Sequence, residues 1–98
     1  MPGRVEGHSV ALFGDNAFII GGFDSYGVTD RIMKVNLKTM VGSIVAAKLC
    51  NKRENHTSQI LDGNKIVVIG GWNGKEAIAA IEVLCYENGT LFNRTNEF

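Results

Sequence analysis

The sequence has little proline, little cysteine and no long run of apolar residues. One proline against twelve glycines among 98 residues favours tight turns between strands over a proline-rich or disordered chain. For the two cysteines, Cys50 and Cys85, we expect reduced thiols, with a disulfide or a two-cysteine metal site as the alternative. No segment approaches the roughly 20 apolar residues of a membrane helix, and the N-terminal residues lack the apolar core of a signal peptide. These absences predict a cytoplasmic protein that does not enter a membrane.

An excess of charge of one sign is also missing. Ten Lys and Arg residues balance ten Asp and Glu residues, so the formal net charge is zero. Because there is no long-range positive field, neither nucleic acid nor an anionic membrane surface is an expected partner. The apolar fraction of 45% is nevertheless enough for a packed core.

The sequence does contain an internal repeat. Residues 66–72 read IVVIGGW, and residues 18–23 read FIIGGF, 49 positions earlier. A short apolar run of this kind fits a strand that is covered on both faces. The two glycines that follow predict either backbone with positive φ or a close approach by another segment, where a Cβ would clash. A repeat of about 50 residues is typical of propeller blades.

The same offset relates identical residues elsewhere in the chain. These pairs are Arg4 with Arg53, Ser9 with Ser58, Leu12 with Leu61, Gly14 with Gly63, and Ile32 with Ile81. The two histidines, His8 and His56, are only 48 positions apart, so one residue has been added between His56 and the second glycine pair. The turn-forming residues 62–65 are the expected place of this insertion.

The pattern predicts eight strands, four in each repeat, arranged as two antiparallel meanders. They are residues 7–13, 17–21, 31–37 and 43–47 in the first repeat and 57–61, 66–70, 80–86 and 90–93 in the second. Residues 23–29 and 72–76 are interpreted as exposed loops. Residues 75–84 carry helix-forming Glu and Ala residues at near-helical spacing, which leaves an α+β fold as the alternative. Because the counterpart at 29–36 has strand character and repeats share a fold, we expect a strand there.

The chain resembles the kelch repeat of the BTB–kelch family over nearly its whole length. That repeat combines Arg-x-x-His-Ser, an apolar run ending in Gly-Gly, Val-Glu-Val-Tyr-Asp and a later Trp. Matching segments are RENHTS at 53–58, IVVIGG at 66–71 and IEV at 81–83, with counterparts at 4–9, 18–22 and 34–39. The late Trp is absent from both repeats, and Val35-Asn36 and Leu84-Cys85 replace Tyr-Asp. The resemblance implies an all-β, kelch-type β-propeller fragment of two four-stranded antiparallel blades, residues 1–49 and 50–98.

Two blades are fewer than the roughly four to eight of a closed propeller. The outer face of each blade would be bare apolar surface, which drives association. Residues 1–4 are similar to the link that leaves a preceding blade. We therefore expect the chain to associate with itself or to be a piece of a larger propeller.

The resemblance further implies a protein–protein interaction module. In the BTB–kelch family one rim of the propeller binds partner peptides through the loops from strand four to strand one and from strand two to strand three. The residues that match these loops are Arg53, Glu54 and Asn55 in the first kind, and Phe23, Asp24, Tyr26, Trp72, Asn73 and Lys75 in the second. Exposed aromatics beside polar groups are typical of binding hot spots. Two alternatives stay open: Phe23 and Trp72 pack against the next blade, and Arg53 forms a structural ion pair.

Among kelch proteins, the resemblance implies substrate recognition for a cullin–RING ubiquitin ligase, joined through a BTB domain that is not within these residues. The alternatives are a kelch scaffold that binds actin and a truncated remnant without independent function. Three glycosylation sequons begin at Asn55, Asn88 and Asn93. Because no signal peptide is visible, we expect them to be unmodified, with an extracellular kelch protein as the alternative.

No catalytic motif is visible, and we predict neither enzymatic activity nor a cofactor. His8 and His56 occupy equivalent places in adjoining repeats, but two ligands fall short of the three or four that zinc requires. The kelch-fold copper oxidases need a Tyr, a Cys and a His pair from several blades, and Tyr26, Tyr86 and Cys85 follow no such arrangement. We therefore expect both histidines to be structural residues at the start of a strand.

Overall fold

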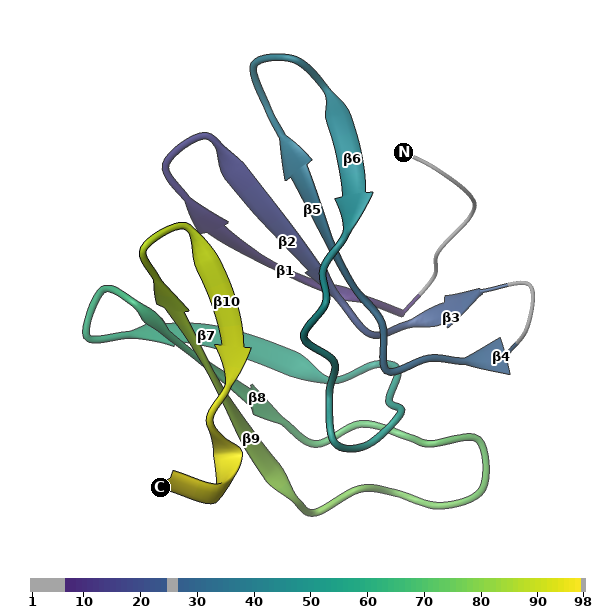
Figure 1. Cartoon of the computed structure of the whole chain (residues 1–98). Helices are drawn as coiled ribbons and strands as arrows, with labels where there is room; N and C mark the ends of the chain where they lie inside the picture. Colours follow the sequence, from purple (N-terminus) through teal and green to yellow (C-terminus); the bar gives the residue numbers. More distant parts are fainter. Residues whose placement is uncertain (1–6, 25–26, 98) are drawn as a thin grey trace.

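The computed structural model describes residues 7–24 and 27–97, and this part of the chain is almost entirely β-structure (Figure 1). The first sheet has the order β1-β2-β5-β6, and the second has the order β10-β9-β8-β7. The strands of the first sheet are β1 (Ser9–Phe13), β2 (Asn16–Ile20), β5 (Ile32–Asn36) and β6 (Val41–Ile44). Those of the second are β7 (Thr57–Leu61), β8 (Lys65–Ile69), β9 (Ile81–Glu87) and β10 (Thr90–Asn93). All neighbouring strands are antiparallel, which confirms the predicted fold class of two four-stranded antiparallel sheets.

The sequence repeat is also a repeat of structure. Strands β2 and β8 begin 49 positions apart, as do β5 and β9, and β6 and β10, whereas β1 and β7 begin 48 apart. The added residue lies in the turn from β7 to β8, where Asp62 and Gly63 have φ of 53° and 77°. The turn from β1 to β2 has only Gly14 at positive φ. The insertion is therefore where the turn residues predicted it.

Two segments differ from the predicted strands. Residues 23–29, interpreted as a loop, contain a short hairpin of β3 (Phe23–Asp24) and β4 (Gly27–Val28). The fourth strand, predicted at 43–47, is β6, which starts two residues earlier and ends three residues earlier, at Ile44. It starts earlier because the side chain of Asn36 closes the preceding turn. Its Oδ1 accepts hydrogen bonds from the backbone N–H groups of Lys38 and Thr39, and this sets Asn36 opposite Val41.

The helical alternative for residues 75–84 is wrong. Residues 81–84 belong to β9, and the preceding segment pairs with the residues that follow β8. The N–H of Ile78 donates to the carbonyl of Gly71, and Trp72 bridges to Ala77. The corresponding contacts in the first repeat join Thr29 to Gly22 and Phe23 to Val28. Pairing between segments thus outweighs the local helix propensity of Glu and Ala. The described residues include one short helix, the single-turn 3₁₀ helix η1 (Thr95–Glu97).

The hydrophobic core lies between the two sheets and takes residues from both repeats. Its buried members are Ala11, Phe18, Ile20, Ile32, Leu49, Ile66, Val68, Leu84 and Leu91. The ring of Tyr86 stacks on Phe13 with 5.1 Å between centroids and meets Phe18 edge-on at 5.4 Å. At the β1–β7 contact, Ser9 Oγ and Ser58 Oγ form a hydrogen bond between the two repeats. The repeats are therefore packed against each other as one body.

The outer face of the second sheet is only partly covered. The prediction that residues 66–69 are buried on both faces is wrong: Ile66 and Val68 are buried, but Ile69 is 41% exposed. On the same outer face the exposed Ile81 is paired with Ile69, and the exposed Leu61 and Phe92 lie at the other end of the strands, opposite Lys65 and Cys85. In the first repeat, by contrast, residues 17–20 are all buried. The strand pattern is the same in both repeats, and the difference comes from what lies against each sheet.

Candidate functional site

The segment between the two sheets, residues 45–56, is held by backbone hydrogen bonds to both repeats, and we call it the connector. Toward the first repeat, the N–H of Arg53 donates to Thr29, and the carbonyl of Arg53 accepts from the N–H of Gly22 at 2.8 Å. Toward the second repeat, Glu54 and Trp72 exchange two backbone hydrogen bonds of 2.9 Å. The connector is therefore a fixed element between neighbouring loops.

Arg53 lies inside this junction and not on its surface. Its guanidinium forms a buried ion pair with Glu82 of β9 at 2.7 Å, and the two side chains are 0% and 1% exposed. The same guanidinium donates to the carbonyl oxygens of Gly70 and Ala80. The interpretation of Arg53 as a partner-binding residue is wrong for this structure, because no part of its side chain is accessible. The alternative, a structural ion pair, is confirmed.

Glu82 is the hydrogen-bond acceptor in this polar network. Its carboxylate also accepts hydrogen bonds from the backbone N–H groups of Cys50 and Asn51 and from the Asn93 side chain. Burial alone would raise the pKa of Glu82, but these hydrogen bonds, together with that from Arg53, outweigh it and hold the pKa below 4.5. The carboxylate is thus ionised and ties the connector to β9 and β10.

The glycine pairs allow the connector to pass close to the sheets. Gly21, Gly22, Gly70 and Gly71 all have positive φ, between 63° and 106°. A Cβ on Gly21 would lie 2.7 Å from the carbonyl oxygen of Arg53, and one on Gly71 would lie 2.6 Å from that of Glu54. At Gly21 and Gly71, both predicted reasons for glycine, a positive φ and the close approach of another segment, are confirmed. At Gly70 only the positive φ favours glycine, because no atom lies within 4 Å of a Cβ built there.

His56 ends the connector as a buried, neutral side chain. Burial lowers its pKa below 6.5, the backbone of Ile20 opposes this, and the charges of Arg53 and His8 lower it further. Neither ring nitrogen has a hydrogen-bond partner among the described residues. Within the same residues no group of three His, Cys, Asp or Glu side chains is placed to hold a metal ion. Cys50 and Cys85 are both free thiols there; Cys50 is exposed and Cys85 is buried.

These pKa shifts predict that the protein loses stability on acidification. Because the folded-state pKa of His56 is lower than the unfolded-state value, the unfolded chain binds more protons below about pH 6.5, and the free energy of unfolding decreases. Glu82 adds a second loss below about pH 4.5, since its folded-state pKa is also lowered. We expect the free energy of unfolding, measured by urea denaturation, to fall between about pH 7.5 and about pH 5.5. The decrease should be smaller in His56→Gln, and an equal decrease in both proteins would contradict the assignment to His56.

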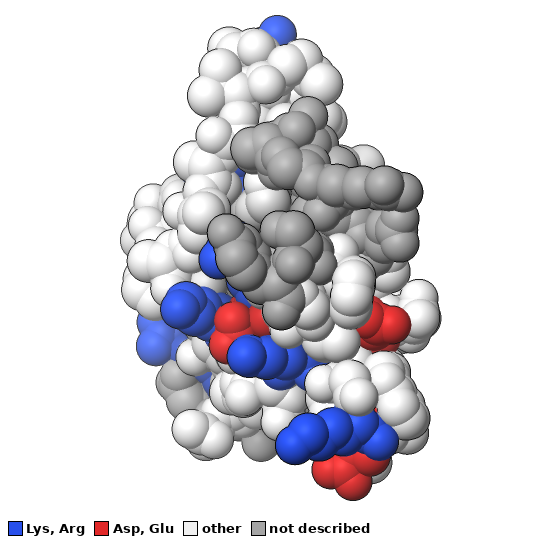
Figure 2. Space-filling view, turned by 90° about the vertical axis from the view of Figure 1, so that its right-hand side faces the viewer, with Lys and Arg blue, Asp and Glu red and all other residues white. Residues whose placement is uncertain are grey.

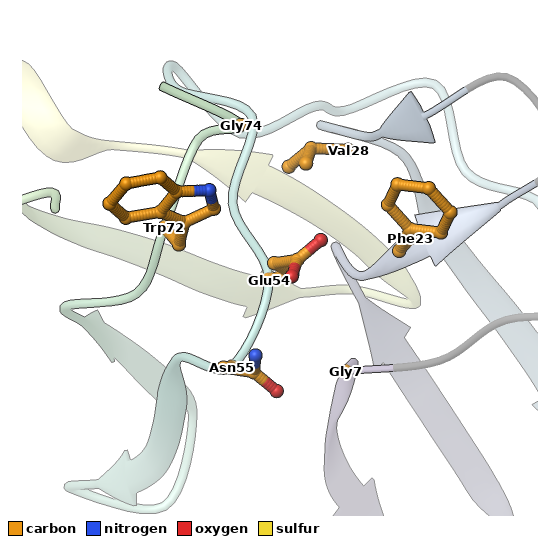
Figure 3. A pocket seen from close by; sticks show the side chains of 7 residues that line it. All are labelled: Gly7, Phe23, Val28, Glu54, Asn55, Trp72 and Gly74. Carbon is orange, nitrogen blue, oxygen red and sulfur yellow. The ribbon is translucent and has the colours of Figure 1, made fainter. Parts of the chain in front are cut away.

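An open pocket of about 440 Å³ lies where the connector meets the loops of the two repeats (Figure 3). Its described lining residues are Gly7, Phe23, Val28, Glu54, Asn55, Trp72 and Gly74. Phe23 comes from β3, Trp72 follows the second glycine pair, and Glu54 of the connector lies between them (Figure 3). Phe23 and Trp72 are 47% and 43% exposed. The pocket thus joins two accessible aromatic side chains with one carboxylate.

Four of the predicted site residues line this pocket, namely Phe23, Glu54, Asn55 and Trp72. Asp24 follows Phe23 in β3, and Tyr26 lies outside the described residues. Asn73 shapes the neighbouring loop, because its Oδ1 accepts hydrogen bonds from the N–H groups of Lys75 and Glu76. Lys75 is exposed and is not among the lining residues. Val28 was not predicted as a pocket residue, because only its pairing with Phe23 in the β3–β4 hairpin places it in the pocket lining.

The surface charge is mixed. On the face shown in Figure 2, the described basic and acidic side chains lie next to one another, and neither sign forms an extended patch. Among the described residues, no helix has the length and apolar composition that crossing a membrane requires.

Fold and pocket together define an all-β protein of two repeated four-stranded sheets, with an aromatic, acidic pocket at their junction. No protein-family model matches the chain, and a search of curated proteins finds no match either.

Proposed function

We propose that this protein is a protein–protein interaction module that binds a segment of its partner in the junction pocket. One observation carries the proposal: Phe23 and Trp72, at equivalent positions directly after the two glycine pairs, are both exposed and line one pocket. Aromatic side chains of this kind are enriched at binding hot spots. The volume of about 440 Å³ lies within the range of roughly 300 to 1,000 Å³ that is usual for ligand pockets.

The two sheets are, in this proposal, neighbouring blades of a kelch-type propeller. The resemblance of residues 53–58, 66–71 and 81–83 to the kelch repeat supports it, as does the buried Arg53–Glu82 pair, which joins two of those segments. The resemblance favours substrate recognition for a cullin–RING ubiquitin ligase in the cytoplasm.

We further propose that the apolar outer face of the second sheet packs against another blade, from a second copy of this chain or from a longer propeller. The exposed Leu61, Ile69, Ile81 and Phe92 share this face and support the proposal, because exposed apolar surface favours association. Light scattering on the purified chain tests it: a folded monomer at micromolar concentration would speak against association between copies.

Trp72→Ala tests the binding function. We expect the variant to bind the partner peptide about 30-fold more weakly, corresponding to about 2 kcal/mol for a truncated hot-spot residue. Its melting temperature should change little, because the indole is 43% exposed and the hydrogen bonds to Glu54 come from the backbone. The peptide is selected by display of random peptides against the full chain, and dissociation constants are measured by calorimetry.

The matched control is Val41→Ala, which truncates an exposed apolar side chain on β6 away from the pocket. It should leave binding unchanged. If Trp72→Ala unfolds the chain, Trp72→Phe and Phe23→Ala replace it. Unaltered binding in both of these variants would show that the pocket is not the site.

A further inference from the structure

The charge of the junction pocket comes from one described residue, Glu54. Its side chain lies between Phe23 and Trp72 (Figure 3). The other described lining residues are glycines, an apolar residue, the two aromatics and the neutral Asn55. Any side chain that enters the pocket therefore meets one negative charge and two aromatic rings.

The carboxylate of Glu54 makes no hydrogen bond or ion pair within the described part of the chain, unlike four other acidic side chains. Glu82 is paired with Arg53, Glu87 with Arg94, Asp15 with Lys38, and Asp62 with Lys65. The neighbouring residue Arg53 does not pair with Glu54, because its guanidinium is buried in the ion pair with Glu82. The pocket thus carries a negative charge that the fold leaves without a counter-ion among these residues.

The position of this carboxylate relative to the indole is set by the backbone. Glu54 and Trp72 are directly opposite each other in an antiparallel bridge, with hydrogen bonds of 2.9 Å in both directions. The N–H of the next residue, Asn55, donates to the carbonyl of Gly7. The acid and the aromatic face are therefore arranged before any ligand binds, which reduces the ordering that binding requires.

We propose that the pocket binds a basic side chain, Lys or Arg, of the partner peptide; this inference rests on the proposed function. The cation is attracted by the Glu54 carboxylate and by the faces of Trp72 and Phe23. An acidic side chain is repelled by Glu54. A neutral apolar side chain contacts the rings but removes water from the carboxylate without replacing its hydrogen bonds. The pocket therefore selects positive charge and not only hydrophobicity.

The single tryptophan of the chain lies in the pocket, so its indole N–H resonance reports occupancy directly. The probes are four peptides, acetyl-Gly-Gly-X-Gly-Gly-amide with X as lysine, arginine, norleucine or glutamate, titrated into the full ¹⁵N-labelled chain. We expect the lysine and arginine peptides to bind about tenfold more tightly than the norleucine peptide, with the glutamate peptide weakest. Raising the salt concentration should reduce this preference, because the site is open to solvent.

Glu54→Gln keeps the size of the side chain and removes its charge. In this variant the preference for the lysine peptide over the norleucine peptide should fall to the small part that the aromatic rings supply. Glu76→Gln removes an exposed acid of the adjacent loop outside the pocket lining, and it should retain the wild-type preference. Equal binding of lysine and norleucine peptides to the wild type would overturn the inference. The inference would also fail if the display-selected peptides require Trp72 for binding, show no enrichment of Lys or Arg, and bind Glu54→Gln as tightly as the wild type. The proposed function would still stand in that case. If neither the defined nor the selected peptides bind, both proposals fail.

Discussion

Replacing Arg53 by Met is expected to lower the free energy of unfolding by about 3 to 5 kcal/mol, the usual cost of removing one partner of a buried ion pair. The variant leaves the ionised carboxylate of Glu82 without its cation inside the protein. It also removes the donor to the carbonyl oxygens of Gly70 and Ala80. Urea denaturation at neutral pH measures the effect, since a single small domain of this size commonly unfolds in one cooperative transition.

Lys38→Met is the matched control, because it removes the cation of an exposed ion pair. Lys38 and Asp15 are 3.4 Å apart, and their side chains are 76% and 56% exposed. Such pairs contribute at most about 1 kcal/mol. If Arg53→Met lowers the free energy of unfolding by no more than Lys38→Met does, the buried network does not hold the two sheets together.

Gly21→Ala is the second substitution with a large expected effect. The new Cβ would lie 2.7 Å from the carbonyl oxygen of Arg53 and 2.8 Å from Cε1 of His56, so the connector must move. The residue also keeps a φ of 63°, which costs an L-residue about 1 to 2 kcal/mol. Overpacking adds about 1 to 3 kcal/mol. We therefore expect a total loss of roughly 3 kcal/mol or more in urea denaturation.

The repeat supplies the control for this variant at the equivalent position. Gly70 has a similar φ of 73°, but nothing lies within 4 Å of a Cβ built on it. Gly70→Ala should therefore show the backbone cost alone, about 1 to 2 kcal/mol. The difference in free energy of unfolding between the two variants measures the clash of the new Cβ with the connector. Equal losses in the two variants would refute the close approach of the connector to Gly21.

Local pattern was sufficient to predict the strand order of the two four-stranded sheets and the place of the inserted residue, but not the β3–β4 hairpin. Runs of β-branched residues ending in Gly-Gly predicted β2 and β8, and the displaced histidine spacing placed the extra residue beside Asp62 and Gly63. These features depend on residues that are close in sequence, so a short window contains the information. Four lining residues of the pocket, Phe23, Glu54, Asn55 and Trp72, were also predicted, because the resemblance to the kelch repeat implies a binding rim made of these loops.

The sequence by itself determined that this is a twofold repeat of antiparallel strands with glycine-dependent junctions. Only the tertiary structure decided that, of the neighbours Arg53 and Glu54, the first is buried and the second faces the pocket. It also decided that Ile69 is exposed although its counterpart in the first repeat, Ile20, is buried. The physical reason is the same in each case: periodicity states which residues share a face, but burial depends on what lies against that face. For Arg53 the deciding partner, Glu82, is 29 positions away in β9.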